Sequence, residues 1–183
     1  MGDDRILITN LPNAEEQTRE LLISMNEFRS EFTNSHNFRG RWENSYLKIE
    51  RVPEVREVMR FARELGLKIL KIRSVVLLKT QETQYRNSNF WFNVAKKGEV
   101  TGLHDHAANS VLSAVTYLQS EHDSGNIFFR KDGFNDIEVK PEVGRLVLFP
   151  SKLKHGVHEN KSKKERISLA FNLLHFPLKN EYL

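Results

Sequence analysis

The sequence contains no cysteine among its 183 residues, which excludes disulfide bonds, thiolate metal sites and a cysteine nucleophile. Glycine and proline number only nine and five, which excludes collagen-like and low-complexity architectures. No apolar run approaches the length of a transmembrane helix, and the longest is Val75 to Leu78. The first residues, Met1 to Asp4, are acidic and lack the apolar stretch of a signal peptide. We therefore expect a cytoplasmic protein that is not embedded in a membrane.

Charged residues of both signs are frequent and nearly balanced. The 28 lysines and arginines outnumber the 24 acidic residues, which gives a formal net charge of +4 and a pI near 9.3. The densest basic segment, 161–166, is typical of a solvated turn between strands. Nucleic-acid binding requires a continuous basic face, so the sequence does not predict a nucleic-acid partner.

Apolar residues in the first third of the chain recur at helical spacing. After Asn13, an expected N-cap, one buried helix face is predicted from five apolar residues: Leu21, Leu22, Met25, Phe28 and Phe32. A second helix is expected to begin at Pro53, and Gly66 is expected to end it in the left-handed conformation. No repeat or linker interrupts the sequence, so we expect a single domain, 1–183, in which residues 1–67 form a helical support region.

The rest of the sequence is typical of short β-strands separated by turns. Strands are expected at seven segments: 68–78, 90–94, 110–118, 126–129, 137–139, 146–149 and 167–174. Gly125, Gly133 and Gly144 mark turns between them. Helices followed by many short antiparallel strands predict a β-sandwich or jelly roll braced by N-terminal helices.

The placement of the histidines is the most informative feature of the sequence. His104 and His106 stand two residues apart, so in a strand both imidazoles point to one face while Asp105 points away. His155 follows the apolar segment 146–150 after a tight turn. A jelly roll can bring this turn opposite the first strand, where three imidazoles would bind one metal ion and leave other positions open. The alternative is that the histidine pair is an ordinary surface feature.

A second polar face is predicted near the end of the chain. Arg166, Ser168, Ala170 and Asn172 alternate with apolar residues, which is the period of a β-strand. One strand face therefore carries a guanidinium, a hydroxyl and a carboxamide, directed to where the metal face is expected. A buried guanidinium requires an anion, and the carboxylate of a ligand suits its bidentate geometry. A salt bridge from Arg166 to a nearby acidic residue is the alternative.

Together these segments resemble a known enzyme family. His104 to His106, 149–155 and 166–172 resemble the double-stranded β-helix core of the Fe(II)/2-oxoglutarate-dependent oxygenases. The most similar subgroup comprises 2OG-Fe(II) oxygenases related to prolyl hydroxylases, whose members share a Trp-x-Asn strand and a Ser-x-x-x-Tyr strand. The corresponding residues here are Trp91 to Asn93 and Ser113 to Tyr117. The resemblance implies a mainly β protein with N-terminal helices.

The resemblance also implies an activity and a set of site residues. The implied protein is an oxidoreductase that uses Fe(II), takes 2-oxoglutarate and O₂ as cosubstrates, and has a cupin-like β-helix core at 68–183. It would hydroxylate an unidentified peptide, protein side chain or small metabolite while 2-oxoglutarate is decarboxylated to succinate. Two histidines, His104 and His155, match the iron ligands of the family, and Asn172 would face the cavity near the metal or substrate. Four residues would contact the cosubstrate: Arg166, Ser168, Asn93 and Tyr117.

The third metal ligand departs from the family pattern. The wider superfamily places Asp or Glu two residues after the first histidine, where this sequence has His106. Because a neutral imidazole replaces a carboxylate there, the metal site would carry one more positive charge. We expect ligation by His104, His106 and His155; water at the third position, or a carboxylate such as that of Asp105, are the alternatives.

Two other functional classes are consistent with the same residues. A cupin-type metalloenzyme with three histidine ligands would not use 2-oxoglutarate, and its Arg166 would serve structure or bind a substrate carboxylate. A non-catalytic jelly-roll binding module would bind metal weakly or not at all. The sequence determines neither the primary substrate nor the oligomeric state.

Overall fold

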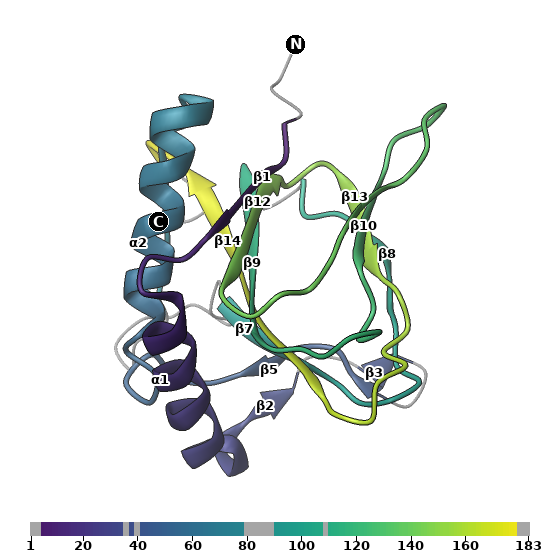
Figure 1. Ribbon diagram of the computed structural model, residues 1–183. Helices are drawn as coiled ribbons and strands as arrows, with labels where there is room; N and C mark the ends of the chain where they lie inside the picture. The colour runs from purple at the N-terminus through teal and green to yellow at the C-terminus, as the bar shows by residue number, and fades with distance from the viewer. Residues whose placement is uncertain (1–4, 35–36, 39–40, 79–89, 108–109, 179–183) are drawn as a thin grey trace.

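Two antiparallel β-sheets face each other in the computed structural model, which describes residues 5–34, 37–38, 41–78, 90–107 and 110–178. The larger sheet has the strand order β1-β12-β9-β14-β7-β5-β2, with β6 also paired to β14. The smaller sheet has the order β11-β10-β13-β8. Figure 1 shows both long helices on the outer side of the larger sheet, away from the smaller one. This arrangement confirms the predicted mainly β class with N-terminal helices.

The strands are short and follow the sequence prediction closely. The larger sheet contains β1 (Leu7–Asn10), β2 (Thr33–Asn34), β5 (Ser45–Tyr46), β6 (Ser74–Val75), β7 (Phe90–Ala95), β9 (Leu112–Gln119), β12 (Arg145–Pro150) and β14 (Arg166–His175). The smaller sheet contains β8 (Thr101–His104), β10 (Ile127–Arg130), β11 (Ile137–Val139) and β13 (Lys154–Val157), while β3 (Asn37–Phe38) pairs with β4 (Arg41–Trp42). Six of the seven expected strands coincide with observed ones to within two residues at each end.

Two helices cover the larger sheet with apolar faces. The helical elements are α1 (Ala14–Glu27), η1 (Arg29–Glu31), α2 (Val55–Leu65) and η2 (Gly66–Leu70). No helix in the described part of the chain is long and apolar enough to span a membrane. Leu21 and Met25 are fully buried, and Leu22, Phe28 and Phe32 pack partly buried against the same core. These contacts confirm the helix face that the apolar spacing predicted.

The side chains of β14 alternate between two cores. Ile167, Leu169 and Phe171 are buried in the core that the larger sheet forms with the helices. Ala170 lies in the second core, between the sheets, together with Trp91. The polar residues that alternate with the first set therefore face the space between the two sheets, where the site lies.

Two local predictions are wrong. Gly66 has a helical φ of −58°, and the helix continues into η2, after which Lys71 adopts the left-handed conformation with φ 59°. A Cβ on Gly66 would lie 2.8 Å from Cδ1 of Leu112, so the glycine permits close helix–sheet packing. The expected strand at 68–78 is reduced to β6, because its first residues are wound into η2. Asn13 is the N-cap residue of α1 as predicted, although its side chain makes no capping hydrogen bond.

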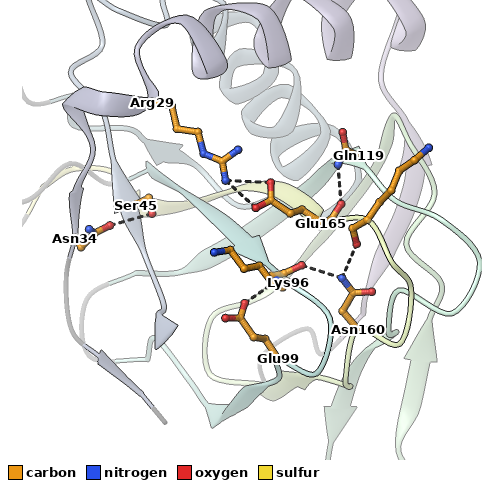
Figure 2. A network of polar contacts seen from close by, with 10 residues as sticks. Arg29, Asn34, Ser45, Lys96, Glu99, Gln119, Asn160 and Glu165 are labelled. Atoms are coloured by element: carbon orange, nitrogen blue, oxygen red, sulfur yellow. Dashed lines mark hydrogen bonds and ion pairs between the residues drawn. The ribbon is translucent and has the colours of Figure 1, made fainter. Parts of the chain in front are cut away.

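A polar network fixes the start of β14 to the N-terminal region. Arg29 donates hydrogen bonds of 2.9 and 3.0 Å to the carboxylate of Glu165, as Figure 2 shows. The amide of Gln119 donates a 2.8 Å hydrogen bond to the backbone carbonyl of Glu165. The amide of Asn160 donates to two carbonyls and so joins the end of β7 to the segment before β14. Since Arg166 follows Glu165, these contacts fix the backbone from which its guanidinium extends.

Candidate metal and cosubstrate site

Three histidines converge in the space between the sheets. His104 ends β8 and lies opposite His155 of β13 in the antiparallel register, with the ring centroids 4.4 Å apart. The ring centroid of His106 is 4.9 Å from that of His104 and 5.4 Å from that of His155. Each side chain offers one ligand atom, and these atoms lie within 4.8 Å of one another. The three imidazoles thus form a group able to hold a single metal ion.

Backbone carbonyls orient two of the three imidazoles. Nδ1 of His104 lies 2.8 Å from the carbonyl oxygen of Gly102, and Nδ1 of His155 lies 2.9 Å from that of Leu153. A carbonyl only accepts hydrogen bonds, so each Nδ1 carries the proton and donates it. Nε2 of each ring is therefore the nitrogen with the lone pair for a metal, in the way that metal-binding histidines are usually held.

Burial lowers the pKa of His106 and of His155 below that of an exposed imidazole. Desolvation is the largest cause for both His106 and His155, and the neighbouring His104 adds electrostatic repulsion. The pKa falls to about 4 for His106 and to about 3 for His155. Both imidazoles are therefore neutral at neutral pH, which is the form that binds a metal ion.

The carboxylate between the first two histidines points away from the group. Asp105 is exposed, and its Oδ1 accepts a 3.1 Å hydrogen bond from the backbone N–H of Ala107. The side chain thus folds back onto its own turn, as an aspartate commonly does. Among the described residues, the group that can hold a metal includes His106 and does not include Asp105.

A cavity of about 210 Å³ brings the expected site residues together. It is lined by the three histidines and by all five other residues that the sequence singled out: Asn93, Tyr117, Arg166, Ser168 and Asn172. These come from β7, β9 and β14, whose registers place Asn93 and Tyr117 on either side of Ser168. Apolar side chains, among them Phe149 and Val157, complete the wall. The sequence pattern therefore located one common cavity.

Main-chain carbonyls hold the guanidinium of Arg166, the first residue of β14. The residue is only 2 % exposed. Its Nη1 donates hydrogen bonds to the carbonyls of Ser124, Gly125 and His158, at 2.5, 3.3 and 3.2 Å. These carbonyls fix the position of the guanidinium, which lines the cavity. A guanidinium placed in this way suits an anionic group of a ligand.

Tyr117 offers a donor beside that cation. The side chain is 2 % exposed, and its hydroxyl has no hydrogen-bond partner among the described residues. Burial raises the pKa of the phenol, an effect that the positive charges of Arg166 and Arg145 oppose without overcoming it. The hydroxyl therefore stays protonated and can donate. A buried donor without a partner is costly, so the cavity fits a ligand with an acceptor oxygen here, as the carboxylates of 2-oxoglutarate would provide.

Among the lining residues that were not predicted as site residues, three make contacts of note. The ring centroid of Trp91 lies 5.7 Å from that of His106, so the indole packs against the third imidazole. Glu43 and Asn44 reach the cavity from the segment before β5. Asn93 holds this segment, because its amide donates to the carbonyl of Glu43 at 2.5 Å and to Oδ1 of Asn44 at 3.1 Å. Trp91 was recognisable from its Trp-x-Asn motif, whereas no pattern marks Glu43 or Asn44.

Comparisons with known proteins show which family and which solved structures this chain is similar to. A family model described as "Putative 2OG-Fe(II) oxygenase" matches residues 89–172, whereas no curated protein matches the chain. A Trichoplax adhaerens prolyl hydroxylase, solved with a hypoxia inducible factor peptide fragment, is similar with a TM-score of 0.69 and 13 % identity, covering 92 % of this chain and 83 % of that one. A Pseudomonas putida prolyl-4-hydroxylase gives 0.64 and 18 %, covering 94 % and 93 %. The α-ketoglutarate-dependent carbocyclase SnoK from nogalamycin biosynthesis gives 0.71 and 12 %, covering 94 % and 80 %.

The solved structures and the family model support different conclusions, the first about the fold and the second about the family. At identities below one fifth, the solved structures establish the fold, which is the double-stranded β-helix expected from the resemblance. The family model covers the segment that carries the histidine group, Arg166 and Asn172. Residues 89–172 therefore match the 2OG-Fe(II) oxygenase family, an oxidoreductase enzyme class.

Proposed function

We propose that the protein is an Fe(II)/2-oxoglutarate-dependent dioxygenase that hydroxylates a primary substrate. His104, His106 and His155 would hold the iron, and Arg166 with Tyr117 would hold the cosubstrate. One observation carries the proposal: a three-histidine group and a buried arginine–tyrosine pair line the same 210 Å³ cavity. When bound, the iron and 2-oxoglutarate supply oxidative decarboxylation to succinate and CO₂, coupled to hydroxylation of a C–H bond.

The histidine group suits a divalent iron that must keep open positions. Three ligands from one side leave the remaining positions for a cosubstrate and O₂, as in the facial triads of non-haem iron oxygenases. His106 replaces the carboxylate of that triad, so the bound metal would retain one more positive charge. That extra charge favours a dianionic cosubstrate. The substitution therefore suits binding of 2-oxoglutarate.

The order of residues along β14 gives the cavity a direction. Ala170 pairs with Trp91, which packs against His106, so this level of the strand lies closest to the metal group. Arg166 and Ser168 lie on one side of it, and Asn172 lies on the other. The cosubstrate would extend from Arg166 toward the metal. The primary substrate would then approach from the side of Asn172.

The protein's own groups would bind, orient and shield the cosubstrate. The guanidinium of Arg166 and the hydroxyl of Tyr117 would donate hydrogen bonds to its distal carboxylate. Ser168, which is 5 % exposed and pairs with Tyr117 across the strands, would add a third donor. The apolar walls would exclude water from this end of the cavity.

Two substrate classes fit the proposal. One structural neighbour is a prolyl hydroxylase solved with a peptide fragment, and another is a carbocyclase from nogalamycin biosynthesis. A peptide or protein side chain and a small metabolite are accordingly the two candidate substrates.

An anaerobic titration tests the proposal. Metal-free protein is mixed with Fe(II) and then with 2-oxoglutarate, and visible absorption is recorded after each addition. A weak charge-transfer band that requires both additions is the expected result, because it reports 2-oxoglutarate bound to iron. Iron binding without this band would favour a cupin-type metalloenzyme that does not use 2-oxoglutarate, and no iron binding would favour a binding module.

Substitution of the arginine tests its assigned role. Arg166→Ala should weaken 2-oxoglutarate binding by about 10- to 100-fold, because hydrogen bonds to charged groups contribute about 1.5–3 kcal/mol. Arg166→Lys should also lose affinity, since it keeps the charge and loses the bidentate fork. The metal affinity should change little in both. The exposed Arg130, which pairs with Asp136, provides the control substitution to alanine. Unchanged 2-oxoglutarate affinity in folded Arg166 variants would refute the role.

A further inference from the structure

The third imidazole of the metal group is held differently from the other two. His104 and His155 each donate Nδ1–H to a nearby carbonyl. No described residue forms a hydrogen bond with the imidazole of His106, which packs against Trp91. His106 also lies beyond the end of β8, so the strand ladder does not fix its backbone. Its position must therefore depend on other contacts.

Two serines clamp the backbone of His106. Its N–H donates a 2.8 Å hydrogen bond to the carbonyl of Ser151. Its carbonyl accepts from the backbone N–H of Ser110 at 3.2 Å and lies 3.2 Å from the hydroxyl of Ser110. The hydroxyls of Ser110 and Ser151 are 2.7 Å apart, which joins the two halves of the clamp. The N–H of His106 is thus bound to the main chain of Ser151 and its carbonyl to Ser110, and the hydroxyls of these two serines are in contact.

The clamp is anchored to the larger sheet by a further hydrogen-bonded pair. The hydroxyl of Ser113 lies 2.9 Å from that of Ser151 and donates a 2.8 Å hydrogen bond to Oδ1 of Asn172. Ser113 and Asn172 are register partners on β9 and β14. Ser151 is fully buried and Ser113 is 3 % exposed, so water does not compete for these contacts. The hydroxyls of Ser113, Ser151 and Ser110 therefore form a continuous series of contacts between the larger sheet and the backbone of His106.

We propose that Ser110 and Ser151 are positioning residues for the third metal ligand, and that Ser113 and Asn172 anchor them. The inference rests on the proposed function in that His106 is taken as a ligand. Hydrogen bonds outside the ligand shell orient metal ligands, and their loss typically lowers metal affinity by about 10- to 100-fold. The clamp acts on the backbone, whereas the carbonyls beside His104 and His155 act on the rings.

The test uses Co(II) alone as the probe. The protein is titrated with Co(II) without 2-oxoglutarate, and the affinity and the visible d–d spectrum are recorded. Ser110→Ala and Ser151→Ala should each lower the affinity by about 10-fold or more and change the spectrum. Ser113→Ala should have a smaller effect, because it is one hydrogen bond farther from His106.

Two control variants separate positioning from general stability. Ser110→Thr keeps the hydroxyl at a half-buried site and should retain the native affinity and spectrum. Ser162→Ala removes another buried hydroxyl, one that donates to the carbonyl of Lys164 at 2.8 Å, and should leave Co(II) binding unchanged. Native affinity and spectrum in Ser110→Ala and Ser151→Ala would overturn the proposal. The same would follow if Ser162→Ala reduced Co(II) affinity equally, since the effect would then be one of stability.

Failure of this inference is distinguishable from failure of the proposed function. Because the probe is the metal alone, a protein that binds Co(II) normally in all serine variants refutes the clamp without affecting the role of Arg166. Conversely, a protein in which the serine variants behave as expected but 2-oxoglutarate does not bind supports the clamp and refutes the oxygenase proposal.

Discussion

Replacing Tyr117 with phenylalanine should change protein stability and cosubstrate affinity in opposite directions. The hydroxyl is buried without a hydrogen-bond partner among the described residues, and an unsatisfied buried donor costs about 1–3 kcal/mol. Tyr117→Phe removes that cost while keeping the ring that packs between the sheets. The free energy of unfolding of the ligand-free protein should therefore rise by about 1–2 kcal/mol, which is roughly 2–8 °C in Tm for a chain of this size.

The same substitution should weaken 2-oxoglutarate binding. A hydrogen bond to a charged acceptor contributes about 1.5–3 kcal/mol, so its loss corresponds to about a 10- to 100-fold higher Kd. Thermal unfolding of the metal-free protein gives the first quantity. Isothermal titration with 2-oxoglutarate in the presence of a redox-inert divalent metal gives the second.

A second buried hydroxyl supplies the matched control. The side-chain oxygen of Thr116 is also buried without a partner among the described residues, but Thr116 does not line the cavity. Thr116→Val should therefore raise stability by a similar amount and leave 2-oxoglutarate affinity unchanged. The reasoning is refuted if Tyr117→Phe lowers the stability of the ligand-free protein, or if it leaves 2-oxoglutarate affinity at the native value.

Three further predictions concern the same cavity. Gly125→Ala should reduce 2-oxoglutarate affinity, because a Cβ at this φ of +88° would lie 2.2 Å from the carbonyl oxygen of His158, which accepts from Arg166, and 2.8 Å from Nη1 of Arg166 itself. Gly133→Ala, with φ +82° and open space, is the calorimetric control and should not reduce it. His106→Asp should retain Co(II) binding by completing a two-histidine, one-carboxylate set, and a calorimetric affinity for His106→Ala equal to that of the native protein would remove His106 from the ligands. In the metal-free protein, the pKa values of about 4 for His106 and about 3 for His155 lie below the 6.5 of an ordinary histidine, so the unfolded state binds more protons. The free energy of unfolding in urea should accordingly fall as the pH drops below 6.5, and less so in His106→Gln; an equal fall in both would contradict the assignment.

The local patterns of the sequence were sufficient for most strands and for the composition of the cavity. The alternation of Arg166, Ser168 and Asn172 with apolar residues holds because β14 separates two chemically different spaces, a dry core against the helices and the cavity between the sheets. The turn glycines also behave as expected, with φ of +88° at Gly125 and +81° at Gly144. Patterns of this kind arise from short-range backbone geometry and can be read directly.

The wrong predictions involve residues whose role is set by distant partners. Gly66 has the sequence context of a helix end, but the side chain of Leu112 packs where its Cβ would lie, and the helix continues. Segment 68–78 is apolar and partly β-branched, yet its first residues extend the helix against the sheet. In both cases tertiary packing outweighed the local preference.

The sequence by itself determined the mainly β class, the polar face of β14 and the set of residues that line the cavity proposed to hold a metal and a cosubstrate. Only the tertiary structure decided that His106 joins the metal group while Asp105 folds onto its own turn. It also decided that main-chain carbonyls bind Arg166 and that Ser110 and Ser151 contact the backbone of His106. The physical reason is that side-chain periodicity depends on neighbours within a strand, whereas ligand orientation depends on hydrogen bonds between segments that are distant in sequence.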